Sequence, residues 1–204
     1  MTTLAMTLAP ARERAGARVA YKVAMALAGA LLMSLLAQVS IPLPFTPVPI
    51  TGQTLGVLLV GASLGPSLGA ASMLVYLLWG FVGLPVFAPE AGGGHLTGTA
   101  ALGFASASAG YLWGFVFAAS AVGVLARRGW DRTMRSSISA MLLGEVVIYA
   151  FGLPWLMMAA DVPFSKAAEW GLYPFIIGDT IKLFLAAGLL PLAWKVTKRG
   201  GADA

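Results

Sequence analysis

The sequence predicts an all-α integral membrane protein, in which six transmembrane helices form one bundle. Two observations lead to this fold class. The chain of 204 residues is 59% hydrophobic and only 10% charged, whereas about a quarter of the residues in a globular domain are charged. The apolar stretches are also continuous rather than alternating, which is typical of membrane helices and not of a membrane β-barrel.

The apolar stretches divide the chain into six predicted spans with short connections. Because nothing separates them into two groups, we expect a single membrane domain over residues 1–204. A transmembrane helix needs about 20 apolar residues, and a span can be shorter where its end lies at the interface. The predicted spans cover about 23–41, 50–64, 67–85, 105–126, 136–158 and 174–194.

The connections contain residues that interrupt helices. Residues 41–50, IPLPFTPVPI, include four prolines, each of which lacks an N–H and restricts the residue before it. We therefore expect a stiff, extended loop on the outer side. Gly65 and Pro66 predict a short inner turn, and the three glycines at 92–94 predict a flexible second outer loop. Together the two outer loops have the character of a lid over a pocket.

The distribution of lysine and arginine predicts the orientation of the bundle. With both termini in the cytoplasm, the outer loops contain only Lys166, and Lys182 lies inside the last span. This asymmetry is a strong positive-inside signal. It also explains the basic composition without nucleic acid as a partner. The inner segments contain Arg12, Arg14, Arg18, Lys22, Arg127, Arg128, Arg132, Arg135, Lys195, Lys198 and Arg199.

The sixth span carries the main functional signal. Asp179 and Lys182 interrupt an apolar run, and a charge at membrane depth costs at least a few kcal/mol. Three residues apart on a helix, the two side chains share one face. They are predicted to line a binding site; the alternative is an ion pair that only positions helices.

Depth places further polar residues near this pair. At a rise of about 1.5 Å per residue, Asp179 lies roughly 8 Å and Lys182 roughly 12 Å below the outer boundary. Tyr111 falls at a similar depth in the fourth span, and Gln53 lies near the top of the second. We therefore expect a substrate pocket in the outer half of the bundle. Glu145 is a third buried charge, whose partner the sequence does not identify.

Small residues mark two faces for close helix packing. Ala20, Ala24 and Ala28 recur every four residues in the first span, a spacing that lets another helix approach. An alanine-rich helix without a special partner explains the same spacing equally well. Gly110 and Gly114 have the GxxxG spacing in the fourth span.

The composition excludes several classes of site. The chain contains no cysteine, and His95 is its only histidine, so we expect no disulfide, no metal site and no cofactor. It contains no Gly-x-x-x-x-Gly-Lys-Ser/Thr loop, so we expect ATP to be hydrolysed elsewhere.

Several motifs together resemble the BioY family, the biotin-specific substrate-binding (S) components of energy-coupling factor (ECF) transporters. The resemblance covers about residues 20 to 195. One segment departs from it: AALGFASASAGYL (100–112) stands where the family often has Gly-Pro-Thr before GYL. The motifs are PFTPVPITGQTLGVLLVGASLGP (44–66), GLPVF (83–87), GYLWGF (110–115), GLPWL (152–156) and GDTIK (178–182).

This resemblance implies high-affinity capture of biotin from outside and its uptake across the cytoplasmic membrane, without enzymatic activity. Asp179 would accept hydrogen bonds from the ureido N–H groups, and Tyr111 would form part of the wall. Lys182 would either donate to the carbonyl or steady Asp179. The backbone at Gly93 or the side chain of His95 would bind the carboxylate. Ala24 and Ala28 would dock a transmembrane coupling subunit driven by two ATPase subunits.

Three other readings remain open at this point. An S component for another vitamin would have the same fold and topology with different pocket contacts. An intramembrane enzyme would use Asp179, Lys182 and Glu145 in acid–base chemistry, and a scaffold subunit would bind no ligand. Competition binding with biotin, thiamine, riboflavin and biotin methyl ester distinguishes an S component for another vitamin from one for biotin. Detection of a reaction product would favour the intramembrane enzyme.

Overall fold

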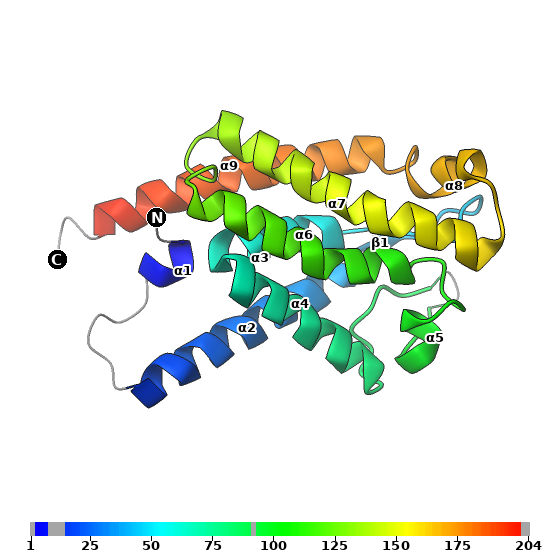
Figure 1. The fold of residues 1–204 in the computed structure, drawn as a ribbon, viewed down its shortest axis with the longest axis horizontal. Helices are drawn as coiled ribbons and strands as arrows, with labels where there is room; N and C mark the ends of the chain where they lie inside the picture. The colour runs from blue at the N-terminus through cyan, green and yellow to red at the C-terminus, as the bar shows by residue number, and fades with distance from the viewer. Residues whose placement is uncertain (1–2, 8–14, 91–92, 201–204) are drawn as a thin grey trace.

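The computed structural model describes residues 3–7, 15–90 and 93–200, and in this part of the chain it is helical apart from one short pair of strands (Figure 1). The predicted all-helical fold class is therefore confirmed. Arg12 and Arg14 lie outside the described residues. The elements are α1 (Leu4–Thr7), α2 (Ala15–Ala37), β1 (Ser40–Ile41), β2 (Ile50–Thr51), α3 (Gln53–Leu64), α4 (Pro66–Phe81), α5 (Gly98–Leu102), α6 (Ala109–Arg127), α7 (Met134–Ala160), α8 (Phe164–Gly171) and α9 (Ile176–Gly200).

Within the described residues, four helices are long and apolar enough to cross a membrane, and two apolar helices are shorter. The long segments are Gly16–Ala37, Ala109–Arg127, Met134–Ala160 and Ile176–Thr197, and the shorter ones are α3 and α4. These six helices occupy the six stretches that the sequence analysis marks as spans, with different ends.

The largest differences from the predicted ends are at the start of α2 and at the end of α9, which continues to Gly200 instead of ending near 194. Helix α2 begins at Ala15 instead of near 23, because residues 15–22 contain neither proline nor a second glycine after Gly16 and continue the helix. It ends at Ala37, and the chain then pairs Ser40 with Thr51 in the strands. Helix α4 ends at Phe81 instead of near 85, since Gly83 adopts a φ of 100° that a helix does not accommodate.

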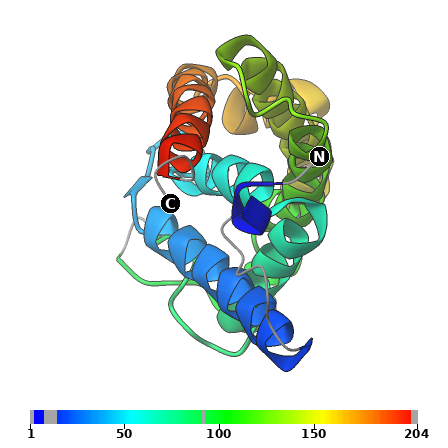
Figure 2. The same cartoon turned by 90° about the vertical axis from the view of Figure 1, so that its left-hand side faces the viewer.

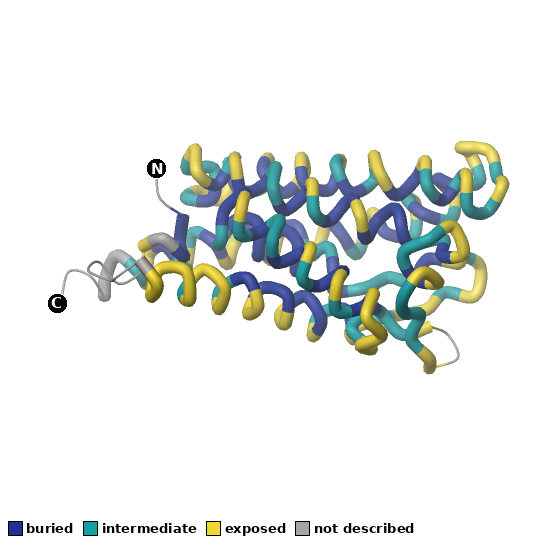
Figure 3. Tube along the Cα trace, turned by 60° about the horizontal axis from the view of Figure 1, so that its bottom comes forward, coloured by how far each residue is buried: buried dark blue, intermediate teal, exposed yellow. Residues whose placement is uncertain are grey.

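Helix α3 occupies the centre of the bundle. It contacts α2, α4, α6, α7 and α9, and Figure 2 shows these helices around it. Its buried residues include Gln53, Val57 and Leu58. Helix α2 lies at the periphery, and much of its first half is exposed (Figure 3). A polar residue on α3 therefore reaches the interior of the bundle rather than its surface.

The two ends of the bundle differ. Helix α1 and the last turns of α9 lie at one end, here the α1 end, and α5, α8 and the strand pair lie at the other, here the α8 end (Figure 1). The α1 end is tied together by Asp131, which accepts a hydrogen bond from Trp194 Nε1 at 2.6 Å. Burial raises the pKa of the Asp131 carboxyl above its usual value. The Arg132 guanidinium lies 4.6 Å from the centre of the Trp194 ring, so the loop between α6 and α7 holds α9 in place.

Glycines allow the helices to pack closely at defined points. A Cβ on Gly110 would lie 2.1 Å from the Trp155 Cβ, and one on Gly114 would lie 3.1 Å from the Phe151 Cβ. The two glycines of the GxxxG motif therefore pack closely against another helix, as predicted, and the structure shows that this helix is α7. Gly61 on α3 meets the backbone of Ala119 on α6, where a Cβ would lie 2.6 Å from the carbonyl oxygen.

Replacement of Gly123 by alanine is expected to destabilise the bundle. A Cβ at this position on α6 would lie 2.4 Å from the carbonyl carbon of Gly65 and from the nitrogen of Pro66. Backbone atoms of a tight turn cannot rotate away, so overpacking is expected to cost about 1–3 kcal/mol. The apparent Tm of the purified protein in detergent should fall by several degrees.

Gly188→Ala is the matched control, because a Cβ at Gly188 on α9 has nothing within 4 Å. Alanine is favoured over glycine inside a helix by roughly 1 kcal/mol, so the apparent Tm should hold or rise. An unchanged Tm in Gly123→Ala would mean that α6 does not depend on close approach to the turn between α3 and α4.

Candidate functional site

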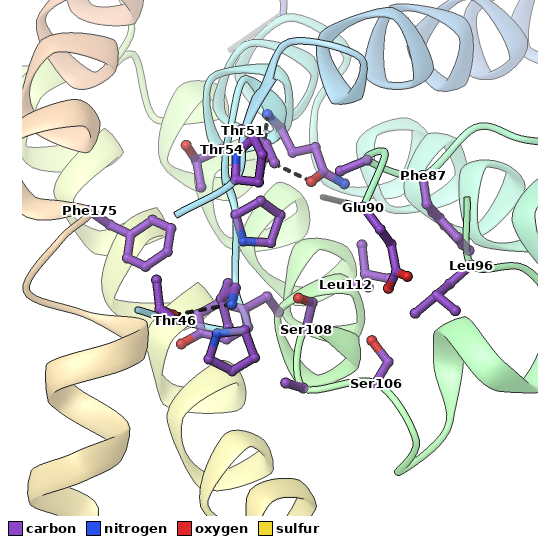
Figure 4. A pocket seen from close by; sticks show the side chains of 18 of the residues that line it. Thr46, Thr51, Thr54, Phe87, Glu90, Leu96, Ser106, Ser108, Leu112 and Phe175 are labelled. Carbon is purple, nitrogen blue, oxygen red and sulfur yellow. Dashed lines mark hydrogen bonds between the residues drawn. The ribbon is translucent and has the colours of Figure 1, made fainter. Parts of the chain in front are cut away.

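A cavity of about 490 Å³ opens among the helices and the loops of the α8 end. Its walls are largely apolar and include Phe87, Phe115, Ile148 and Phe175. The loop between β1 and β2 contributes its prolines at 42, 47 and 49. Figure 4 shows side chains from this loop, from α6 and from Phe175 around the opening. An apolar cavity of this size with a few polar groups is typical of a site for a small molecule.

Asp179 forms the centre of a polar cluster in this cavity. Its Oδ1 accepts hydrogen bonds from Lys182 Nζ at 2.9 Å and from Thr54 Oγ1 at 3.1 Å. Its Oδ2 accepts a hydrogen bond from the Tyr149 hydroxyl. Lys182 Nζ also donates to Thr54 Oγ1 at 3.1 Å. The four side chains come from α3, α7 and α9 and all line the cavity, so the predicted pair shares one face of α9 and faces a pocket.

The cluster is shielded from solvent but is not closed off. The exposed fraction of the side chain is 8% for Asp179 and 14% for Lys182. An ion pair in such surroundings is stabilised by charge-assisted hydrogen bonds. Because both residues line the cavity, a ligand with its own donors and acceptors can replace some of these bonds. The arrangement therefore suits recognition of a polar group that has N–H donors next to a carbonyl.

Gln53 lines the cavity at the first turn of α3. Its amide nitrogen donates to the Tyr76 hydroxyl at 2.7 Å, and its amide oxygen accepts from Thr51 Oγ1 at 2.8 Å. Gln53 is buried, and Tyr76 is buried completely. The amide thus links α3 to α4 and to the strand pair, and these bonds hold it at the cavity wall.

Tyr111 forms part of the wall from α6. Its hydroxyl donates to the carbonyl oxygen of Gly171 at 2.9 Å. Its ring meets the ring of Tyr149 edge to face, with 6.1 Å between the centroids. The ring also lies against Gly152, where a Cβ would come within 2.3 Å of it. Tyr111 therefore supports Tyr149, which in turn bonds to Asp179.

The loop between β1 and β2 covers part of the cavity. The antiparallel pairing of Ser40 with Thr51 and of Ile41 with Ile50 closes the base of this loop. Thr46 Oγ1 donates to the carbonyl oxygen of Trp170 at 2.7 Å and accepts from the Val48 N–H at 3.1 Å. The loop is thus fixed at its base and is joined to α8 near its middle.

The two predicted residues of the second loop lie outside the cavity lining. The N–H of Gly93 donates to the carbonyl oxygen of Glu90 at 2.9 Å, and Gly93 is exposed. His95 Nδ1 lies 2.8 Å from the carbonyl oxygen of Phe87, and the His95 backbone bridges to Pro89. These bonds shape the loop itself. Asp179, Lys182, Tyr111 and Gln53 are brought together in the cavity, whereas Gly93 and His95 are not.

The sequence does not single out two partners of Asp179 or several further polar residues of the wall, Thr46 and Glu90 among them. Thr54 and Tyr149 belong to the cluster, and Ser106 and Ser108 line the cavity before α6. The one sequence signal that points to Thr54 is its position next to Gln53, where two polar residues begin an apolar helix.

Glu145 lies on α7 one turn before Tyr149. It is buried, and neither carboxylate oxygen has a hydrogen-bond partner within the described residues. It does not line the cavity. Among residues 3–7, 15–90 and 93–200, no group of three histidine, cysteine, aspartate or glutamate side chains is placed to hold a metal ion.

The sequence matches the model of the BioY family over residues 6–199. The chain belongs to the BioY family. Among its BioY relatives is the biotin transporter BioY of Rhizobium etli, with 40% identity over 169 residues, covering 79% of this chain and 86% of the relative. The biotin transporter BioY of Thermotoga maritima is 34% identical over 148 residues, covering 72% of this chain and 81% of the relative. A probable biotin transporter BioY of Pyrococcus horikoshii is 38% identical over 152 residues, covering 74% of this chain and 82% of the relative.

The fold is also similar to that of a solved structure. A crystal structure of the S component for biotin from an ECF-type ABC transporter superimposes with a TM-score of 0.75. The match covers 90% of this chain and 95% of that chain at 24% sequence identity. The resemblance to the BioY family that the sequence motifs predict is confirmed by the family match, and this BioY chain is a membrane protein.

Proposed function

We propose that this chain captures biotin at the outer face of the cytoplasmic membrane and supports its uptake as the S component of an ECF-type transporter. The observation that carries this function is the cavity with Asp179 and Lys182 in its wall, in a chain whose relatives are biotin transporters. Transport, and not catalysis, is the activity of this family.

The chemistry of the polar cluster matches the ureido ring of biotin. This ring has two N–H donors on either side of one carbonyl acceptor. The carboxylate of Asp179 can accept from the N–H groups, and the ammonium of Lys182 can donate to the carbonyl. Thr54 and Tyr149 keep the carboxylate oriented through their hydrogen bonds. Four apolar side chains, Phe87, Phe115, Ile148 and Phe175, then pack against the sulfur ring and the aliphatic tail.

Tyr111 and Gln53 are proposed as the remaining contacts of the ring. Both line the cavity, and both are held by hydrogen bonds to other elements. A polar group fixed in this way meets the ligand without losing further side-chain freedom. The role of Gly93 and His95 in binding the carboxylate stays a prediction, which their absence from the cavity lining does not favour.

The proposed topology has six spans in one membrane domain, with both termini in the cytoplasm. The α1 end would then be the inner end, and the cavity with its loops would open outward (Figure 1). The arginines and lysines of the sequence support this orientation, because eleven of them fall in the inner segments and only Lys166 falls in an outer one. Helices α3 and α4 are shorter than a full span, and the strand pair and proline-rich loop extend α3 toward the outer surface.

The proposed partners are a transmembrane coupling subunit and two ATPase subunits. The chain has no phosphate-binding loop of its own. Ala24 and Ala28 lie on an exposed face of α2. This helix packs mainly against α3 and α4, and its Tyr21 hydroxyl donates to the carbonyl oxygen of Ala5 in α1 at 2.8 Å. Small residues on such a face allow a second helix to approach closely in the membrane. We propose this face as the docking surface for the coupling subunit.

A calorimetric titration of the purified, folded protein with biotin tests the function. We expect one biotin per chain, tight binding and a higher apparent Tm, because a ligand that binds only the folded state stabilises it. Thiamine and riboflavin, titrated in parallel, should give no heat. If biotin gave neither heat nor stabilisation in a sample with a cooperative melting transition, the proposed substrate would be wrong.

A further inference from the structure

Ser106 is a nearly buried residue whose hydroxyl remains open to the cavity. It is only 7% exposed, lines the cavity, and its hydroxyl has no hydrogen-bond partner in the described part of the chain. Figure 4 shows its oxygen turned into the cavity. Its backbone carbonyl oxygen accepts a hydrogen bond from Trp155 Nε1 at 3.0 Å. The segment is therefore held in place by α7, while the hydroxyl remains unpaired.

The start of helix α6 adds a second hydroxyl beside Ser106. Ser108 also lines the cavity and occupies the N-cap position, but its side chain makes no capping hydrogen bond. The N–H of Ala109 bonds to the carbonyl oxygen of Ser106 at 3.3 Å, and that of Tyr111 bonds to the carbonyl oxygen of Ser108 at 3.1 Å. The helix therefore contributes mainly the positive end of its dipole. Two hydroxyls and the beginning of a 19-residue helix thus meet at one wall of the cavity.

The charges of the cavity are unevenly placed. Among the described residues that line it, the charged ones are Glu90, Asp179 and Lys182. Lys182 is already engaged by Asp179 and Thr54. No second cation is available for an anionic tail, and Figure 4 shows Glu90 on the same side of the view as Ser106, away from Phe175. Glu90 is exposed, so this acidic side chain of the cavity wall weakens the preference of the site for negative charge only slightly.

We propose that Ser106 and Ser108 at the start of α6 hold the tail end of the ligand, and that this uncharged donor set accepts a neutral amide tail as well as a carboxylate. The inference rests on the proposed function, in which the ureido ring occupies the Asp179 cluster. It extends the substrate class from biotin to biotin amides.

The physical basis is that the carbonyl oxygen of an amide accepts the same hydrogen bonds as a carboxylate oxygen. A site built on arginine or lysine would lose a charge-assisted bond with the amide. A site built on hydroxyls keeps its hydrogen bonds with the amide and loses only the strengthening that a charged acceptor gives to them. The opposite binding mode, with the carboxylate at Lys182, would reject the amide strongly.

The first test compares biotin with biotinamide on the wild-type protein by calorimetry in detergent. We expect the dissociation constants to agree within about tenfold. A larger loss for biotinamide, when biotin itself binds tightly, would overturn this inference and leave the proposed function intact. Failure of biotin to bind would instead count against the proposed function.

The second test uses variants. Ser106→Ala and Ser108→Ala should each weaken both ligands by about threefold to tenfold, as expected for the loss of one hydrogen bond. Glu90→Gln should strengthen the binding of biotin and leave that of biotinamide unchanged. Ser139→Ala on the exposed face of α7 is the control, since its hydroxyl bonds only to the carbonyl oxygen of Arg135. Unchanged affinity in both cavity-serine variants, with an unchanged apparent Tm, would overturn the assignment.

Discussion

Asp179→Asn is expected to weaken biotin binding by at least about tenfold, since a hydrogen bond that involves a charged group contributes roughly 1.5–3 kcal/mol. The substitution keeps the shape of the side chain but removes the charge that pairs with Lys182. An amide has one acceptor oxygen, so Thr54, Tyr149, Lys182 and the ligand would compete for it. Calorimetry measures the dissociation constant, and thermal unfolding without biotin measures the effect on the fold.

Asp161→Asn is the matched control for this prediction. Asp161 ends α7 with a φ of 50°, a conformation that asparagine also adopts, and it is exposed and outside the cavity lining. The same chemical change there should leave biotin affinity unaltered. Wild-type affinity in Asp179→Asn would remove Asp179 from the site and would return the pair to the role of positioning helices.

Replacement of both Ala24 and Ala28 by tryptophan is expected to abolish biotin uptake in cells while leaving biotin binding to the purified chain unchanged. Both alanines lie on the exposed side of α2, away from the cavity. Two indole rings would keep a partner helix from the close approach that small residues permit. Co-purification with the coupling subunit should fall by at least about tenfold, which corresponds to roughly 1.4 kcal/mol.

The control places the same bulk elsewhere in the membrane. Leu185 and Leu189 are exposed on α9 and are also four residues apart, so Leu185→Trp with Leu189→Trp tests whether added aromatic surface alone impairs uptake. If the α2 variant lost biotin binding as well, α2 would be a core helix. If it still assembled normally, the docking surface would lie on another helix.

The parts of the site that the sequence predicts are those with a strong local signal. Asp179 and Lys182 stand out because charges are rare inside an apolar run. Thr54 and Tyr149 do not stand out, since threonine and tyrosine are ordinary residues in membrane helices. Their role depends on which faces of α3 and α7 meet α9, and this is a property of tertiary packing.

The hydrogen bonds of the loops are likewise not predictable from the sequence. Three glycines suggested backbone N–H groups free to bind an anion, but the N–H of Gly93 and that of Glu90 are used in hydrogen bonds within the loop. Local spacing cannot reveal such competition. The helices of the bundle are easier to predict from the sequence than the loops. Long apolar stretches and the GxxxG pair of α6 follow rules that hold in any helical membrane protein.

The proline-rich loop between β1 and β2 bears on how long a ligand stays bound. Its base is closed by strand pairing, its backbone is restricted by proline, and Thr46 joins it to α8. A cover that is already ordered loses little entropy when the ligand enters. Release then requires a stiff segment to move as a unit, so a slow dissociation rate, more than a fast association rate, would set the affinity. A transporter with this cover would retain scarce substrate until its partner subunits force the loop open.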